Sequence, residues 1–420
     1  MASTPSSSKG FGTLLDIPSL FALRTFSWLG KYPDLNNTLI CLIPKVSKPK
    51  TIHQFCPIGL CNTIYKTITK ILFQRLKPHL DNLMHPFQAS FILRHKASDN
   101  VIFAQELIHT MSISKSKHGL MALKIDLEKA FDRLEWGFIK HILSFFNFPT
   151  NWIELIMSCI SSSNLSVLVN RERLNYFLPS RGIRQRDPLS PYIFILCMEY
   201  FARLILCKVD AHSWSGIRTS RDGPTFSHIF FADDLILFAK ATKRNCLTIK
   251  NTLDKFCSLS EQKIILSKSK IYFSPHTSLD NISTAERELS MRACSNFVKY
   301  LGVSILTSKR NTRAFNFLID KLRSRLANWK ASTLSLAGRL TLSRQSPLPF
   351  PHTLCRTPCS TPRFAKRSKK LIRTSYGGDS TTKRRIHLLN WNSVTLPRAA
   401  GGLGIKISIH RNKALLPKHL

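Results

Sequence analysis

Two adjacent aspartates, Asp233 and Asp234, stand between two short apolar runs and carry the clearest chemical signal in the chain. The flanking runs, 228–231 and 235–238, favour strands, and the residues between them favour a turn. The pattern therefore predicts a β-hairpin with carboxylates at its tip. Neighbouring carboxylates raise each other's pKa unless a hard divalent cation neutralises them, so the pair is typical of a metal-dependent site. Aspartate is also common in turns for local hydrogen-bonding reasons, and that structural interpretation stays open for the pair alone.

A third carboxylate, Asp126, directly follows the apolar run 121–125. Beyond it, apolar residues recur at three- and four-residue spacing as far as Phe138, which predicts an amphipathic helix that begins right after the aspartate. A strand ending in Asp126 and a later hairpin with two acids would bring three carboxylates to one sheet edge, a set suited to two Mg²⁺ ions and phosphoryl transfer. Taken alone, Asp126 is better explained as a surface residue at a helix N-terminus, stabilised by the helix dipole.

The motifs around these aspartates resemble the reverse transcriptase of plant non-LTR, LINE-type retrotransposons. Three motifs follow one another in the family's order: Asp126-Leu127-Glu128-Lys129-Ala130-Phe131-Asp132, then Arg181-Gly182-Ile183-Arg184-Gln185 with Asp187-Pro188-Leu189-Ser190-Pro191, and last Phe231-Ala232-Asp233-Asp234. Further similar segments are Leu42-Ile43-Pro44-Lys45, Pro57-Ile58, Asp99-Asn100, Lys268-Ser269 and Tyr300-Leu301-Gly302-Val303. The similarity covers roughly residues 35 to 345 and resumes over 386–405. A single Phe-Ala-Asp-Asp is weak evidence, whereas the ordered series is specific.

The resemblance implies an α+β chain with right-hand polymerase architecture, in which an antiparallel palm sheet packs on helices. The expected boundaries are a poorly structured segment at 1–37, fingers at 38–118, a palm at 119–299 with a return to the fingers at about 140–190, a thumb at 300–346, a basic, proline-containing irregular region at 347–385 and a truncated connection segment at 386–420. Irregular structure is expected at 347–385 because five prolines fall between positions 347 and 362 and proline disrupts a helix interior.

The resemblance also implies an RNA-directed DNA polymerase that adds deoxynucleoside triphosphates to a DNA primer on an RNA template. Asp126, Asp233 and Asp234 are then the catalytic residues and the ligands of two Mg²⁺ ions, with Mn²⁺ as the alternative ion. The rival interpretation is a catalytically inactive retrotransposon remnant that only binds nucleic acid. An RNA-dependent RNA polymerase shares the acidic pattern but fits Phe131 poorly.

Three further residues are implied to contact the substrate. Lys45 would reach the triphosphate, Phe131 would close off the sugar 2′ face, and Gln185 would lie beside the template and the incoming base. An aromatic ring at the 2′ face excludes a hydroxyl group by its volume. From periodicity alone Phe131 fits a core position equally well, and Lys45 fits an ordinary solvated lysine, so both interpretations stay open.

Composition points to a polyanionic partner. Lysine and arginine number 62 against 24 acidic residues, which gives a net charge of +38 and a pI near 10.2. Nucleic acid is the obvious partner, and phosphate-driven binding should weaken steeply with salt. The hydrophobic share of 43% and the strong local periodicity argue against disorder over most of the chain.

Other features bear on the compartment. The eleven cysteines form no CxxC pair, which predicts free thiols in a reducing compartment. The longest apolar segment, 192–207, contains Glu199 and Arg203, so it predicts a buried helix and no membrane partner. An intracellular site is expected, and a nuclear one only by analogy with elements that prime on chromosomal DNA. The oligomeric state is not predicted.

Several positions depart from the family's pattern. Arg186 and Glu261 each stand where the family has glycine, and Cys56 stands where it has arginine. Arg94-His95 replaces Gly-Arg, and Ile265 replaces asparagine. Glycine serves where the backbone approaches a ligand closely, so Arg186 is expected to impair catalysis. With the altered 347–385 region and the missing flanking domains, these changes predict a truncated, partly degenerate element.

Overall fold

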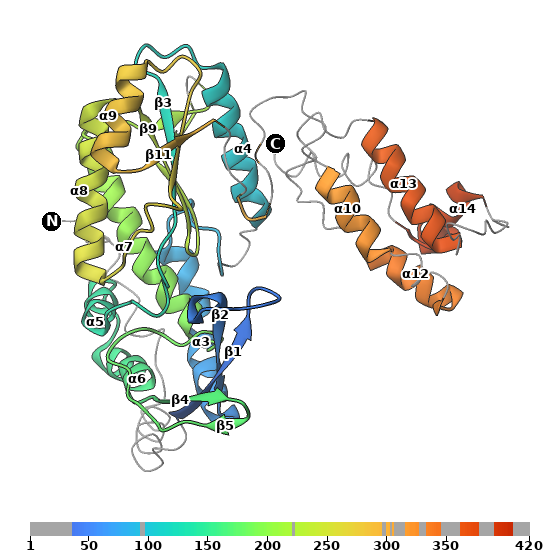
Figure 1. Ribbon diagram of the computed structural model, residues 1–420, viewed down its shortest axis with the longest axis horizontal. Helices are drawn as coiled ribbons and strands as arrows, with labels where there is room; N and C mark the ends of the chain where they lie inside the picture. Colours follow the sequence, from blue (N-terminus) through green and yellow to red (C-terminus); the bar gives the residue numbers. More distant parts are fainter. Residues whose placement is uncertain are drawn as a thin grey trace. The chain divides into compact units, whose positions relative to one another are not determined.

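The computed structural model describes residues 36–92, 97–220, 223–295, 300–302, 305, 316–326, 333–345, 362–377 and 390–405. The chain divides into two compact units (Figure 1). The first comprises Met1–Ala97 with Ile113–Ser295, and the second comprises Ser98–Ser112 with Asn296–Leu420. Mixed helices and sheets make the chain α+β, as predicted.

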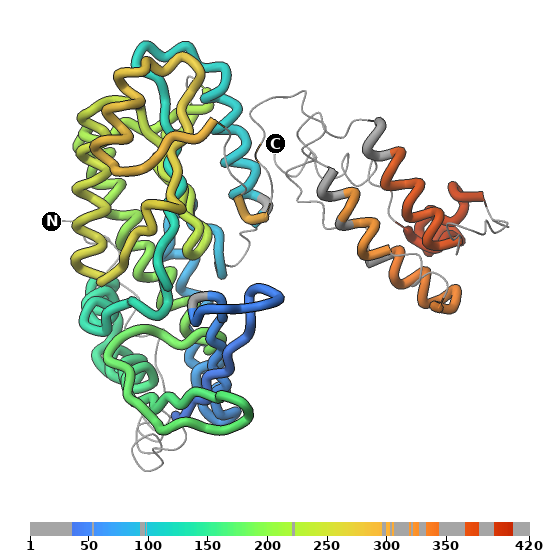
Figure 2. Tube along the Cα trace, viewed as in Figure 1, coloured from blue at the N-terminus to red at the C-terminus, as the bar shows by residue number. Residues whose placement is uncertain are grey.

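A five-stranded sheet forms the centre of the first unit. Its strands are β3 (Leu120–Ile125), β8 (His228–Phe231), β9 (Asp234–Lys240), β10 (Lys270–Phe273) and β11 (Arg292–Cys294), in the order β11-β10-β3-β9-β8. All neighbours are antiparallel except β10 and β11, which are parallel. The Cα trace shows how segments far apart in the sequence become neighbours in this sheet (Figure 2).

Helices cover one face of this sheet. They are α5 (Trp136–Phe145), α7 (Ser190–Asp210), α8 (Lys243–Ser260) and α9 (Leu279–Leu289). Alternate residues of β3, such as Met121 and Leu123, join the apolar core with residues of these helices. Phe201 of α7 stacks on Phe230 of β8 with ring centroids 5.5 Å apart. The helix predicted at 192–207 lies within α7, and most of its side chains are buried, as expected.

A second sheet lies in the same unit and joins distant parts of the chain. It contains β1 (Asn37–Pro44), β2 (Phe55–Cys61), β4 (Asn164–Val169) and β5 (Glu172–Arg173), in the order β2-β1-β4-β5. A 3-10 turn, η2 (Ile52–Gln54), precedes β2, and β6 (Ile217–Arg218) pairs with β7 (Thr225–Phe226) elsewhere in the unit. Because β4 pairs in parallel with β1, part of the stretch 140–190 lies beside the N-terminal strands.

Two helices tie this second sheet to the rest of the unit. They are α3 (Thr63–Leu83) and α6 (Thr150–Ser161). The Tyr65 hydroxyl of α3 donates a hydrogen bond of 3.0 Å to the Cys159 carbonyl of α6. The Asn36 side-chain amide, just before β1, donates to the same carbonyl at 3.2 Å. These buried contacts fix the end of β1 against both helices.

The helix predicted to start right after Asp126 does not start there. Residues 127–135 form turns, and α5 begins only at Trp136. The intervening backbone makes tertiary contacts instead, because Leu127 bridges Ile264 and the Glu128 amide donates to the Lys263 carbonyl. Apolar spacing alone could not distinguish a helix from turns that bury the same residues.

The second unit is helical in its described parts. It holds most of α4 (Ala97–Ile113), then α10 (Asn316–Arg325), α12 (Leu336–Gln345), α13 (Pro362–Gly377), α14 (Trp391–Thr395) and the 3-10 turn η5 (Arg398–Ala400). Helix α13 packs against α10 and α12. The prediction of irregular structure at 347–385 is therefore wrong for 362–377. Pro362 occupies the first turn of α13, where proline is tolerated, and the earlier prolines lie outside the described residues.

Two predictions can be compared only with the described residues. The cysteines found there are free thiols. Within the same ranges, no helix combines the length and apolar character needed to cross a bilayer.

Candidate active site

The hairpin predicted around the paired aspartates is present. β8 and β9 pair through Phe231 opposite Asp234, which leaves Ala232 and Asp233 as a two-residue turn. Ala232 has a φ of +53°, in the left-handed region that residues with a Cβ seldom adopt. Its amide donates a hydrogen bond of 2.8 Å to the buried Ser90 hydroxyl. The surrounding fold therefore holds the turn in a conformation that costs free energy locally, which is common at functional sites.

Asp126 reaches the same end of the sheet. Ile125, the last residue of β3, is opposite Leu235 in β9, so Asp126 and Asp234 extend from neighbouring strand ends. The Asp126 amide donates to the Ser269 hydroxyl at 3.1 Å, and its carbonyl accepts from the Ile265 amide at 2.8 Å. The structure thus brings the three sequence-predicted carboxylates to one edge.

The electrostatics of Asp233 show that the three acids influence one another. Partial desolvation raises the pKa of the Asp233 carboxyl above its usual value, and the negative charges of Asp234 and Asp126 raise this pKa further. A hydrogen bond to its own backbone and the charge of Lys124 act in the opposite direction. A cation placed among the carboxylates would favour their ionised forms.

A lysine already neutralises one of the acids. The Lys124 ammonium lies 3.6 Å from the Asp234 carboxylate, and both side chains are partly exposed. Lys124 precedes Asp126 by two residues, so the two side chains emerge on the same face of β3. Its position opposite Ile236 places it diagonally across from Asp234 on β9.

The donor chemistry fits a hard divalent cation, because such ions prefer carboxylate oxygens. The three carboxylates have suitable donor atoms, but they are not arranged as a metal site. Among the residues that the structure describes, no three His, Cys, Asp or Glu side chains gather closely enough to hold a metal ion. Asp234 is instead paired with the Lys124 ammonium.

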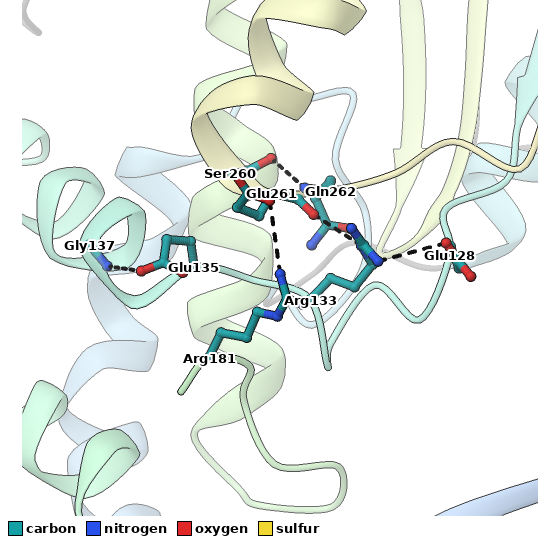
Figure 3. Close-up of polar contacts among 8 residues, drawn as sticks. All are labelled: Glu128, Arg133, Glu135, Gly137, Arg181, Ser260, Glu261 and Gln262. Atoms are coloured by element: carbon teal, nitrogen blue, oxygen red, sulfur yellow. Dashed lines mark hydrogen bonds and ion pairs between the residues drawn. The ribbon is translucent and has the colours of Figure 1, made fainter. Parts of the chain in front are cut away.

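The turn after Asp126 is anchored by the segment that follows α8 (Figure 3). The buried Gln262 side chain donates a hydrogen bond of 2.8 Å to the Ala130 carbonyl. The Arg133 Nε donates to the Glu261 carbonyl at 3.0 Å, and the Arg133 guanidinium also lies 3.8 Å from the Glu128 carboxylate. These contacts make the end of α8 a support for the turn that follows Asp126.

The segment 181–185 also contacts this turn. The Ile183 amide donates to the Phe131 carbonyl at 2.9 Å. Gly182 has a φ of +88°, and a Cβ there would come within 2.6 Å of the Asp132 carbonyl oxygen. Only glycine permits this approach, which brings Gln185 to the turn. The Gln185 amide donates to the Asp132 carboxylate at 3.3 Å, a bond that opposes the effect of desolvation, which raises the pKa of Asp132.

Arg184 anchors the segment 181–185 to β1 and α6. Its guanidinium donates to the Thr38 hydroxyl at 3.0 Å and to the Cys159 carbonyl at 2.7 Å, and it stacks 4.0 Å from the centre of the Tyr65 ring. Asp187 is buried and accepts from the Tyr65 hydroxyl at 3.5 Å. Residues 184 and 187 are both anchored inward, so the two residues between them must form a tight bend.

A cavity of about 420 Å³ opens beside this bend. Gln185, Arg181 and Lys129 contribute to its lining from one side, and β1 and β2 contribute from the other. Its polar groups are an amide, a carboxylate and several cationic side chains, while much of its wall is apolar. A mostly apolar wall with a few polar groups is typical of small-molecule sites, and the three carboxylates are not among the lining residues.

Two positions where glycine was expected from the resemblance have left-handed backbone. Arg186 has a φ of +70°, and Glu261 has a φ of +58° at the C-terminal end of α8. Glycine adopts this conformation with little strain, whereas other residues lose roughly 1–2 kcal/mol there. The Arg186 residue is exposed, so its strain is in the backbone and is not overpacking by the side chain.

The other predicted substrate residues are less clearly defined. Phe131 is half-buried and stacks on Phe194 of α7, with ring centroids 4.7 Å apart and planes inclined by 13°. That contact supports its core role and leaves part of the ring accessible. Lys45 is exposed after β1, and its amide donates to the Gln54 carbonyl. Its predicted contact with triphosphate stays a prediction.

Sequence reasoning missed Lys124, Asp132 and Arg184 as parts of the site. The position of Lys124, two residues before Asp126 on a strand, was a usable signal. No sequence pattern predicted that Arg184 would donate hydrogen bonds to β1 and α6, because these contacts arise from long-range packing.

The fold and this edge of acids define a nucleic-acid polymerase type of protein, and comparison with known families agrees. A family model described as reverse transcriptase (RNA-dependent DNA polymerase) matches residues 43–305, and the chain belongs to this family. Membership confirms the polymerase fold class expected from the motif series.

Two of the relatives come from mobile elements. The chain is 26% identical over 321 residues to a Transposon TX1 uncharacterized 149 kDa protein of Xenopus laevis, a match that covers 75% of this chain and 24% of that protein. It is 25% identical over 257 residues to a retrovirus-related Pol polyprotein of the type-2 retrotransposable element R2DM of Drosophila melanogaster, covering 60% and 23%. The chain thus spans about a quarter of the length of these relatives. These matches support the resemblance to non-LTR retrotransposons.

A plant protein and solved telomerases also match. An uncharacterized mitochondrial protein of Arabidopsis thaliana is 43% identical over 70 residues, covering 17% of this chain and 57% of that protein. A telomerase structure from Candida tropicalis, in complex with a TWJ fragment of telomeric RNA, aligns with a TM-score of 0.45 at 13% identity and covers 86% of this chain and 63% of that one.

Proposed function

We propose that this chain is the RNA-directed DNA polymerase domain of a plant non-LTR retrotransposon. The observation that carries the proposal is the placement of Asp126, Asp233 and Asp234 at neighbouring strand ends of one sheet edge, in a chain of the reverse transcriptase family. The substrates would be an RNA template, a DNA primer and deoxynucleoside triphosphates. Their phosphates match the strongly basic character of the chain.

The protein's own residues have distinct tasks in this reaction. Asp126, Asp233 and Asp234 would hold two Mg²⁺ ions, or Mn²⁺ in their place. When bound, the ions supply charge neutralisation at the transferring phosphoryl group and an activated primer hydroxyl. The anchored turn and the Ser269 hydroxyl keep Asp126 in place. Gln185, which donates a hydrogen bond to Asp132, would contact the nucleotide.

Phe131 and Lys45 complete the proposed substrate contacts. Stacking on Phe194 immobilises the Phe131 ring, so its exposed edge can exclude a ribose 2′-hydroxyl by volume. Lys45 follows β1 at an exposed position from which a lysine can reach an anionic triphosphate. The family's fingers, palm and thumb correspond in this proposal to 38–118, 119–299 and 300–346.

A second candidate function is nucleic-acid binding by a catalytically inactive remnant. The left-handed Arg186 next to Gln185 favours it, because a strained arginine stands in the bend that would touch the nucleotide. Cys56 in β2 favours it as well, since the expected arginine would have provided a phosphate donor.

Primer extension separates these candidates. The purified chain is given an RNA template, a DNA primer and either deoxynucleotides or ribonucleotides with Mg²⁺. Extension with deoxynucleotides that Asp233→Asn abolishes supports the polymerase. Extension that survives Asp233→Asn refutes the assignment of the carboxylates, and extension by ribonucleotides indicates an RNA polymerase. Extension that appears only after Arg186→Gly identifies a decayed enzyme.

A further inference from the structure

Helix α13 of the second unit, labelled in Figure 1, carries buried residues on one face and exposed residues on the other. Ser368, Ile372 and Ser375 are buried, and α13 packs against α10 and α12. The exposed side chains form a cationic set: Lys366, Arg367, Lys369, Lys370 and Arg373. At about 100° per residue, the cations fall within an arc of about 160° that does not overlap the buried face.

Nothing within α13 neutralises these charges. Its sequence, Pro362–Gly377, contains no aspartate or glutamate. In the described parts of the chain, the ion pairs that form involve none of the five cations. Lys366 and Lys370 are four residues apart, as are Lys369 and Arg373, so the like charges face one another and repel. A polyanion laid along this face would remove that repulsion.

We propose that the exposed face of α13 is a nucleic-acid docking surface that grips the phosphate backbone. From Lys366 to Arg373 the helix rises about 10 Å, a length that faces about three phosphates of one strand. Among the side chains that the structure describes, residues 366–377, the exposed face offers charges and no aromatic ring for stacking on bases. Tyr376, near the end of α13, instead packs edge-on against Trp391 with ring centroids 6.5 Å apart. Binding at this surface is therefore independent of base sequence.

This surface and the carboxylate edge belong to different units, and binding at the surface does not depend on catalysis. An inactive chain would keep it, and an active polymerase would use it to hold its nucleic acid during extension. Asp233→Asn distinguishes the two properties, because it should abolish extension and leave binding at α13 unchanged.

The test compares two full-length variants with the same loss of charge. The first removes four cations from α13: Lys366→Gln, Lys369→Gln, Lys370→Gln and Arg373→Gln. The control removes three lysines and one arginine from exposed positions on α8: Lys243→Gln, Arg244→Gln, Lys250→Gln and Lys255→Gln. Fluorescence anisotropy measures the affinity of each for a labelled single-stranded RNA of about 30 nucleotides over a range of salt concentrations.

The α13 variant should lose about 2 to 3 units from the slope of log affinity against log salt, at about 0.7 per phosphate contact. The α8 variant should lose less than about 1 unit. Equal losses in both variants would show that net charge, and not this face, determines binding, and an unchanged slope in the α13 variant would equally overturn the proposal. Loss of binding to phosphatidylserine vesicles without loss of RNA binding would assign the face to a membrane.

A second measurement uses the unmodified chain and so does not depend on the folding of a variant. Lysine acetylation with and without the same RNA is read by mass spectrometry. RNA should protect Lys366, Lys369 and Lys370 at least several-fold more than the α8 lysines. Equal modification of the α13 lysines with and without RNA would refute the docking surface.

Discussion

The Lys124 ammonium lies 3.6 Å from the Asp234 carboxylate, across the strands β3 and β9. In a water-like medium, two unit charges at this separation attract with about 1 kcal/mol. A divalent cation that binds Asp234 must overcome this attraction and the repulsion of the nearby ammonium. We therefore expect Lys124 to lower the affinity of the carboxylate edge for a metal ion.

Replacing Lys124 by methionine should tighten binding of Mn²⁺ by about five- to tenfold, because a competing charge worth about 1 kcal/mol is removed. Isothermal titration calorimetry on the free protein measures this without any need for activity. Lys124→Arg keeps the charge and should bind as the unmodified chain does. Lys240→Met, at the far end of β9, controls for net charge, and tightening of the same size there would contradict the role of Lys124.

Arg186→Gly should raise the free energy of unfolding by about 1 kcal/mol, because glycine adopts a φ of +70° with little strain. Urea denaturation measures the change. Arg292, an exposed arginine in β11 whose φ is negative, is the matched control, and Arg292→Gly should destabilise the chain. A loss of stability in Arg186→Gly would show that the arginine makes favourable contacts that outweigh its backbone strain.

Arg184→Lys should lower the free energy of unfolding by about 1–3 kcal/mol, because lysine cannot reproduce the two hydrogen bonds and the stacking on Tyr65. If the chain is active, KM for nucleotide should rise too. Gln185, the proposed nucleotide contact, is held in position by the adjacent Arg184. Tyr65→Phe keeps the stacking surface and should cost less. A variant as stable as the unmodified chain would show that the half-buried Arg184 does not anchor the bend.

Phe131→Ala should relax the preference for deoxynucleotides by about tenfold or more if the ring excludes the 2′-hydroxyl. Primer extension with each nucleotide type measures the ratio of kcat/KM. Phe194→Leu removes the stacking partner and leaves the Phe131 ring. It therefore tests whether loss of packing stability alone changes the preference for deoxynucleotides. An unchanged ratio in Phe131→Ala, with extension intact, would leave Phe131 as a core residue.

Glu199 should make stability depend on pH. Burial raises the pKa of Glu199 to about 7, while the His85 amide and Arg203 lower it. The folded chain then holds a proton that the unfolded chain has released, so this contribution to stability is lost as pH rises toward and through 7. Glu199→Gln should become more stable relative to the unmodified chain between pH 5 and 7, by at most about 1.4 kcal/mol per pH unit. Urea denaturation at each pH measures the difference, and parallel curves would contradict the raised pKa.

The sequence by itself determined the chemical character of this protein. Asp126 and the pair Asp233-Asp234 follow apolar runs whose short periods specify strands, and local spacing is enough to locate strand ends and the buried helix α7. The order of the motifs was enough to identify the family, because that order can be observed directly in the amino-acid sequence.

Tertiary structure decided what lies between the motifs. The segment 127–135 became turns because its backbone bonds to residues after α8, and α13 formed within a stretch expected to be irregular because it has helices to pack against. The Lys124–Asp234 ion pair and the anchoring of Arg184 join residues on different elements. Contacts of this kind depend on how strands and helices are brought together in space, which periodicity along one segment does not encode.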